Sequence, residues 1–85
     1  MLLIREDAVL LDGRPLHLTD RETAVLRALA GGRVVSRSEI RRAAQLDQHS
    51  DRRCDSILVG LRRVLPEGAI RNVRGRGWML EHPIE

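Results

Sequence analysis

The segment from residue 51 to residue 65, with the sequence DRRCDSILVGLRRVL, constrains the fold of this chain most strongly because a single helical period runs through it. Its apolar residues recur three and four positions apart, which places them along one side of an α-helix. They are Cys54, Ile57, Leu58, Leu61, Val64 and Leu65. The opposite side carries four arginines, and Pro66 is expected to end the helix. The pattern predicts a helix that packs on a core through one side and presents a basic surface with the other.

The basic charge of the chain is concentrated in this helix and in the residues that follow it. The whole sequence of 85 residues has 15 basic residues, all of them arginine, and 12 acidic residues, for a net charge of +3. Residues 51–78 alone contain seven arginines and three acids, a net charge of +4, whereas residues 1–50 contain eight arginines and seven acids, a net charge of +1. A positive field confined to one helix and its continuation favours a partner with a phosphate backbone.

The composition excludes several classes of protein. Trp78 is the one aromatic residue, so the core must consist of aliphatic side chains, and a platform that stacks single-stranded bases is not expected. One cysteine permits no intramolecular disulfide bond. No run approaches the roughly 18 apolar residues of a membrane span, and charges at residues 5–7 interrupt the apolar start of the chain. We therefore expect a cytoplasmic protein without membrane attachment, and a single domain over residues 1–85.

The beginning of the chain predicts a small antiparallel sheet. Strands are expected at residues 2–5, 8–11 and 15–18. Asp12-Gly13 forms a two-residue loop of the kind favoured in tight hairpins, and Pro15 makes a central position less favourable for the third strand.

Two capping signals then mark the starts of two helices. Thr19 stands three residues before Glu22, and Ser36 stands three residues before Glu39, as in a capping box. The first helix is expected to stop at the glycine pair 31–32 and the second near residue 44, with a polar connection over residues 45–50.

After the long helix, residues 69–73 and 78–81 are expected to form two strands around a basic turn. The turn contains Gly75 and Gly77, and a dinucleotide-binding loop with this spacing would need a third glycine where Leu80 stands. A tight hairpin turn therefore explains both glycines. The order of strands, three helices and a hairpin predicts an α+β fold.

In this order the chain resembles the winged-helix DNA-binding domain of OmpR-type response regulators, over nearly all of residues 8–81. The motifs that carry the resemblance are Leu18-Thr19 with Glu22, Val25 and Leu26; Ser36-Arg37 with Glu39 and Ile40; Arg52 and Asp55 with Leu61, Arg62 and Leu65; and Val73-Arg74-Gly75-Arg76-Gly77-Trp78. The resemblance implies a winged helix-turn-helix whose third helix enters the major groove of duplex DNA, while the hairpin wing reaches an adjacent minor groove.

The resemblance and the basic surface together predict the residues that bind DNA. By position, the phosphates would be contacted by Arg52, Arg62 and Arg63, and the bases would be faced by Ser56, Val59 and Gly60. The full predicted set is Arg37, Arg52, Arg53, Ser56, Val59, Gly60, Arg62, Arg63, Asn72, Arg74 and Arg76. Val59 and Gly60 offer no side-chain donor to base edges, so we expect a shallow sequence preference. A glycine within a helix costs about 1 kcal/mol relative to alanine, which suggests that DNA backbone or a partner protein approaches Gly60 closely.

An enzyme, a metal site and a cofactor are not expected. Cys54 lies on the apolar stripe without a charged base nearby in the sequence, and the three histidines lack the spacing of metal ligands. The alternative to a duplex-binding module is an accessory interaction or regulatory domain, because winged helices of this kind also resemble appendages of biosynthetic enzymes such as uroporphyrinogen-III synthase. A larger parent protein and tandem copies both remain open.

Overall fold

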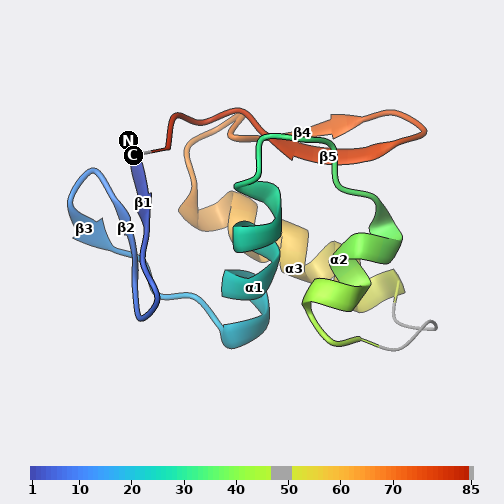
Figure 1. Cartoon of the computed structure of the whole chain (residues 1–85), viewed down its shortest axis with the longest axis horizontal. Coiled ribbons are helices and arrows are strands. Elements are labelled where there is room, and N and C mark those ends of the chain that lie inside the picture. The colour runs from blue at the N-terminus through green and yellow to red at the C-terminus, as the bar shows by residue number, and fades with distance from the viewer. Residues whose placement is uncertain (47–50, 85) are drawn as a thin grey trace.

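The computed structural model describes residues 1–46 and 51–84, and it has the predicted α+β order of strands, three helices and hairpin (Figure 1). Most of the polar connection predicted at residues 45–50 lies outside the described residues. The elements in chain order are β1 (Leu2–Ile4), β2 (Val9–Leu11), β3 (Arg14–Pro15), α1 (Asp20–Leu29), α2 (Arg37–Ala43), α3 (Asp51–Val64), β4 (Ile70–Val73) and β5 (Gly77–Leu80).

The N-terminal sheet has the antiparallel order β1-β2-β3 and stands at one end of the molecule (Figure 1). Asp12 and Gly13 have φ angles of 52° and 84°, both in the left-handed region, and Leu11 pairs with Arg14 across them. This is the two-residue hairpin loop that the sequence predicts, and its left-handed backbone matches the twist of the strands.

The third strand was predicted at residues 15–18, and that prediction is wrong. Because the two-residue loop places Arg14 directly opposite β2, pairing begins immediately after Gly13, and β3 covers only Arg14–Pro15. Pro15 lies at the edge of the sheet, where its missing N–H is tolerated. One further bond, from the Leu16 N–H to the Val9 carbonyl at 2.8 Å, follows before the chain leaves for α1.

Both predicted helix caps are present. The Thr19 hydroxyl accepts from the Glu22 N–H at 3.1 Å, and the Glu22 carboxylate accepts from the Thr19 N–H at 2.9 Å, which completes the capping box of α1. The Ser36 hydroxyl accepts from the Glu39 N–H at 3.2 Å at the start of α2. These local bonds satisfy amide groups that have no partner within the helix.

The core lies where the three helices meet, and the hairpin closes it. The predicted stripe of α3 is buried: Cys54 and Leu61 have no exposed surface, and only Val64 at its edge is half-buried. Trp78 of β5 is 6 % exposed, so it belongs to the core as a large apolar residue would. All buried residues of the described ranges are apolar, which leaves the polar face of α3 as its exposed side.

The hairpin is tied to the segment before α2 by its backbone. The Val35 N–H donates to the Trp78 carbonyl at 2.7 Å, and the Trp78 N–H donates to the Val35 carbonyl at 2.9 Å. Gly77 has a φ of +144°, and a Cβ there would stand 2.7 Å from the Val35 carbonyl carbon and closer still to its oxygen. The turn explains Gly75, whose φ is +75°, whereas Gly77 is required by this close approach and not by the turn.

The N-terminal sheet buries Leu2 and Val9 in the common core, and hydrogen bonds also attach it to the rest of the molecule. The Arg27 side chain of α1 donates to the backbone carbonyls of Arg5 and Glu6, the latter at 2.7 Å. The Leu2 N–H of β1 donates to the Pro83 carbonyl at 3.0 Å. Among the described helices, none is long and apolar enough to cross a membrane.

Candidate nucleic-acid interface

The outer surface of α3 is basic and open. Arg52, Ser56, Val59 and Arg63 recur three and four residues apart on the side opposite the buried stripe, and all four are exposed. Val59 is 47 % exposed, which is unusual for a valine in a helix that otherwise buries its apolar residues. Arg53 and Arg62 are also exposed and flank this row. Helical geometry thus gathers the side chains predicted from the sequence on one surface.

Gly60 lies on the flank of α3 that faces α1 and is half-buried. A Cβ at this position would stand 3.3 Å from the Glu22 Cδ and nearer to one of its carboxylate oxygens. The close approach predicted at Gly60 is therefore present, and in this structure the approaching group is the Glu22 carboxylate of the same chain. Glu22, the partner of Thr19 in the capping box of α1, takes the space that a side chain at position 60 would need.

The opposite flank of α3 carries Asp55, which forms an ion pair with Arg37 of α2. The Arg37 Nη1 lies 2.9 Å from the Asp55 Oδ1, and the Arg37 guanidinium carbon lies 5.1 Å from the centroid of the Trp78 ring. Arg37 was predicted to bind DNA, whereas Asp55 was not among the predicted site residues. The acids of both flanks, Glu22 and Asp55, carried no signal in the sequence beyond their place in family motifs.

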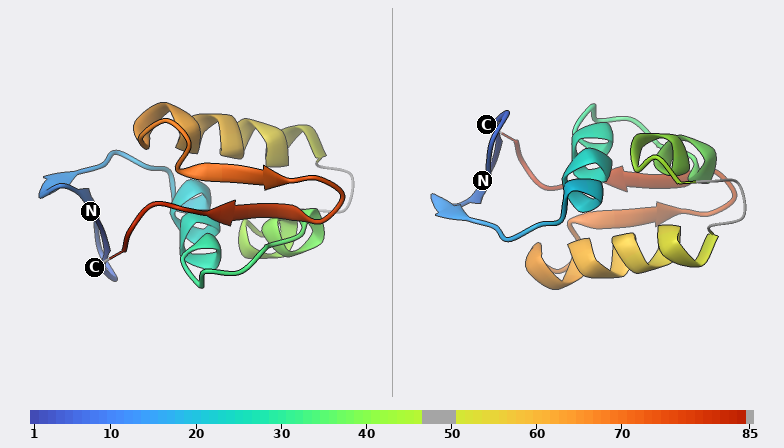
Figure 2. Two further views of the ribbon diagram at one scale, coloured as in Figure 1. Left: turned by 90° about the horizontal axis from the view of Figure 1, so that it is seen from above. Right: turned by 90° about the horizontal axis from the view of Figure 1, so that it is seen from below.

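The wing carries the second group of arginines. Arg74 and Arg76 lie in the turn between β4 and β5 and are exposed, as is Asn72 in β4. The hairpin runs alongside α3, and its turn lies at the end of the molecule where α3 begins (Figure 2). The basic turn and the first arginines of α3 therefore share one end of the molecule.

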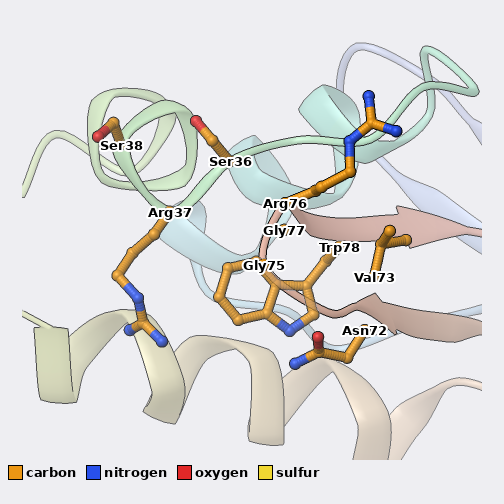
Figure 3. A pocket seen from close by; sticks show the side chains of 9 residues that line it. All are labelled: Ser36, Arg37, Ser38, Asn72, Val73, Gly75, Arg76, Gly77 and Trp78. Atoms are coloured by element: carbon orange, nitrogen blue, oxygen red, sulfur yellow. The ribbon is translucent and has the colours of Figure 1, made fainter.

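A hollow of about 420 Å³ separates the start of α2 from the wing (Figure 3). Ser36, Arg37 and Ser38 line it from one side, and Asn72, Val73, Gly75, Arg76, Gly77 and Trp78 line it from the other. Arg37 points across the Trp78 ring toward α3, whereas Arg76 points away from it. Both arginines were predicted to bind DNA, but they extend in different directions.

Ion pairs with acids hold some arginines of the described residues and leave those of α3 and the wing turn open. Arg33 lies 2.6 Å from Glu39 and Arg71 lies 3.1 Å from Glu81. The bond from Arg33 holds the pKa of the Glu39 carboxyl below its usual value. Within residues 1–46 and 51–84, no acid forms an ion pair with the following arginines: 52, 53, 62, 63, 74 and 76. Their positive charge is available to an anionic partner.

The described part of the chain offers no cluster of three or more His, Cys, Asp or Glu side chains that could hold a metal ion. Cys54 is fully buried, with its sulfur 3.9 Å from the Arg37 carbonyl, so it lies in the core and away from the surface hollows. The candidate site is a basic binding surface.

The chain is similar in structure to known DNA-binding domains. No protein-family model and no curated protein matches the sequence, whereas solved structures match nearly the whole chain. The DNA-binding domain of the response regulator AdeR, in complex with an intercistronic region, is 26% identical with a TM-score of 0.85, over 96% of this chain and 95% of that one. The DNA-binding domain of CpxR from Escherichia coli is 30% identical with a TM-score of 0.73, over 86% and 80% of the two chains. That of CssR from Bacillus subtilis is 25% identical with a TM-score of 0.77, over 94% and 99%.

Proposed function

Because this chain belongs to the family of OmpR-type winged-helix DNA-binding domains, we propose that it is the duplex-DNA-binding module of a bacterial transcriptional regulator in the cytoplasm. In this proposal α3 lies in the major groove and the wing reaches an adjacent minor groove, with residues 1–85 as one binding unit. The observation that carries the proposal is the set of exposed arginines on α3 and on the wing turn that form no ion pair with any acid in residues 1–46 and 51–84.

The proposal assigns most of the affinity to phosphate contacts. Arg52, Arg62 and Arg63 contact the backbone on both sides of the major groove, and Arg74 enters the minor groove. Val59 is exposed enough to touch a thymine methyl group, and Ser56 can form hydrogen bonds with several bases. Neither side chain discriminates sharply, so the domain prefers narrow-groove sites, and a single copy binds weakly unless copies are tethered or bind side by side.

The test is fluorescence anisotropy with a labelled duplex over a series of salt concentrations. With about four to six phosphates engaged, the logarithm of the affinity should fall against the logarithm of the salt concentration with a slope of about −0.9 per phosphate. Arg52→Ala and Arg62→Ala should each flatten this slope by roughly one. Arg74→Ala should weaken binding most on duplexes with a narrow minor groove.

Arg14→Ala provides the matched control, because Arg14 is exposed on the N-terminal sheet and lies outside the proposed interface. It removes the same charge and should leave the slope unchanged. Absence of duplex binding by the unaltered protein at low salt would contradict the proposal and would favour an accessory interaction domain.

A further inference from the structure

The Arg37 side chain connects three elements that the proposed function needs in a defined arrangement. It starts at α2, forms an ion pair with Asp55 on α3 at 2.9 Å, and lies over the ring of Trp78 in β5 at 5.1 Å. The Arg37 side chain is 38% exposed and that of Asp55 is 59% exposed, whereas Trp78 is 6% exposed. The Arg37 guanidinium therefore lies over the ring of the buried Trp78 and at the same time forms an ion pair with the exposed Asp55.

The backbone around Arg37 is itself attached to the wing. Two residues earlier, Val35 exchanges two hydrogen bonds with Trp78, at 2.7 and 2.9 Å, and Gly77 permits this approach. The start of α2 is thus joined to the wing through the backbone and to α3 through the Arg37 side chain. A planar guanidinium can stack on an indole and bond to a carboxylate at once, which an ammonium group cannot do as well.

We infer that Arg37 is a positioning residue that, together with Asp55 and Trp78, sets the placement of the wing relative to α3 before duplex binds. This inference rests on the proposed function and changes the role of Arg37 from the predicted DNA contact to an intramolecular bracket. A rigid arrangement of two binding elements saves the entropy of ordering them when the partner arrives. Loss of the bracket therefore weakens binding without removing a phosphate contact.

Removal of the Asp55 carboxylate distinguishes a positioning role for Arg37 from a phosphate contact, because the two roles predict opposite changes in duplex affinity. Asp55 is an acid on the helix that approaches the phosphates, so its removal should strengthen binding if Arg37 is a phosphate contact, because Arg37 is released and a repulsive charge disappears. If Arg37 is part of the bracket, removal of Asp55 weakens binding. The two outcomes are opposite, and both can be measured in one anisotropy experiment.

The experiment compares Asp55→Ala, Arg37→Ala and the double variant of the full chain. Each single change should lower duplex affinity about fivefold, as expected for loss of an exposed ion pair and a cation–π contact, and the double variant should be no weaker than either one. The salt slope should stay that of the unaltered protein, because no phosphate contact is lost. Arg37→Lys should also lower the duplex affinity, although it keeps the positive charge.

A second measurement uses the free protein and needs no DNA. Trp78 is the one aromatic residue, so its fluorescence reports on the ring alone, and both Arg37→Ala and Asp55→Ala should shift its emission and increase quenching by acrylamide. Glu81→Ala is the control, because it breaks the exposed Arg71–Glu81 ion pair in the same region and should leave the emission unchanged. Circular dichroism checks that each variant is folded, and Asp55→Asn replaces Asp55→Ala if the latter is not.

Tighter binding by Asp55→Ala, together with a slope flattened by about 0.9 in Arg37→Ala, overturns the bracket and returns Arg37 to the phosphates. Unchanged Trp78 emission in both folded variants also overturns it. If the unaltered protein binds no duplex, the proposed function fails, and the Trp78 emission still decides whether the bracket exists.

Discussion

Replacement of Gly77 by alanine should destabilise the domain far more than a single methyl group suggests. The new Cβ would stand 2.7 Å from the Val35 carbonyl carbon and 3.0 Å from the Ser36 Cα, both backbone atoms that cannot rotate away. β5 and the segment around Val35 must then separate, and the two hydrogen bonds between Val35 and Trp78, each with a net contribution of about 0.5–1.5 kcal/mol, would be lost. The φ of +144° adds about 1–3 kcal/mol for a residue with a side chain.

The expected cost of Gly77→Ala is therefore about 2–6 kcal/mol, set against a total of about 4–13 kcal/mol for a domain of this length. At about 4–8 °C per kcal/mol, the melting temperature followed by far-UV circular dichroism should fall by at least about 8 °C. Gly75→Ala is the control, because its φ of +75° brings strain of about 1–2 kcal/mol but its Cβ would meet open space. A Gly77→Ala variant that melts within two or three degrees of the unaltered protein would refute the close approach.

Three further results are expected. Gly60→Ala should change the melting temperature little, because the new methyl group displaces the Glu22 carboxylate from its capping position and offsets a gain of about 1 kcal/mol in helix propensity. In a Glu22→Ala background, where no carboxylate is displaced, the same change should raise the melting temperature. The Arg33 bond lowers the pKa of Glu39 in the folded protein, so this bond stabilises the fold above the ordinary glutamate pKa and loses its effect as the pH falls through the lowered value. Between neutral and acidic pH, the melting temperature of Glu39→Gln should therefore fall less than that of the unaltered protein. Selection of duplexes from a random pool should return a shallow preference for AT-rich sites. A strong multi-base consensus bound tightly by the monomer would contradict the expectation that Val59 discriminates poorly between bases.

Structure that depends on residues close together in the sequence could be predicted from it. The Asp12-Gly13 loop, the capping box of Thr19 and Glu22, and the buried stripe of α3 each follow from a pattern within a few residues, and the structure confirms them. The predicted third strand began one residue too late and ended three residues too late, because strand limits depend on where the partner strand pairs.

Contacts between distant parts of the chain could not be predicted in the same way. The glycine at position 60 indicated a close neighbour, but nothing near it in the sequence identified Glu22 as that neighbour. Arg37 was predicted to be among the DNA-binding residues, but the charge pattern gave no sign of its ion pair with Asp55, because that acid lies 18 residues away in the sequence. Intramolecular partners such as Asp55 decide whether an arginine is available to DNA, and they depend on the packing of whole helices.

The hydrogen bond between Leu2 and Pro83 has a consequence for the order of events during synthesis. β1, β2 and β3 are close in the sequence and can pair as soon as they leave the ribosome, but the outer edge of β1 acquires its partner only about 80 residues later. At about 5–20 residues per second, that edge waits on the order of 4–16 seconds, during which its amide groups can pair with a neighbouring nascent chain. The residues after β5 therefore cover the outer edge of β1 only after the rest of the domain has been synthesised, and we expect the yield of monomer to depend on how quickly translation reaches them.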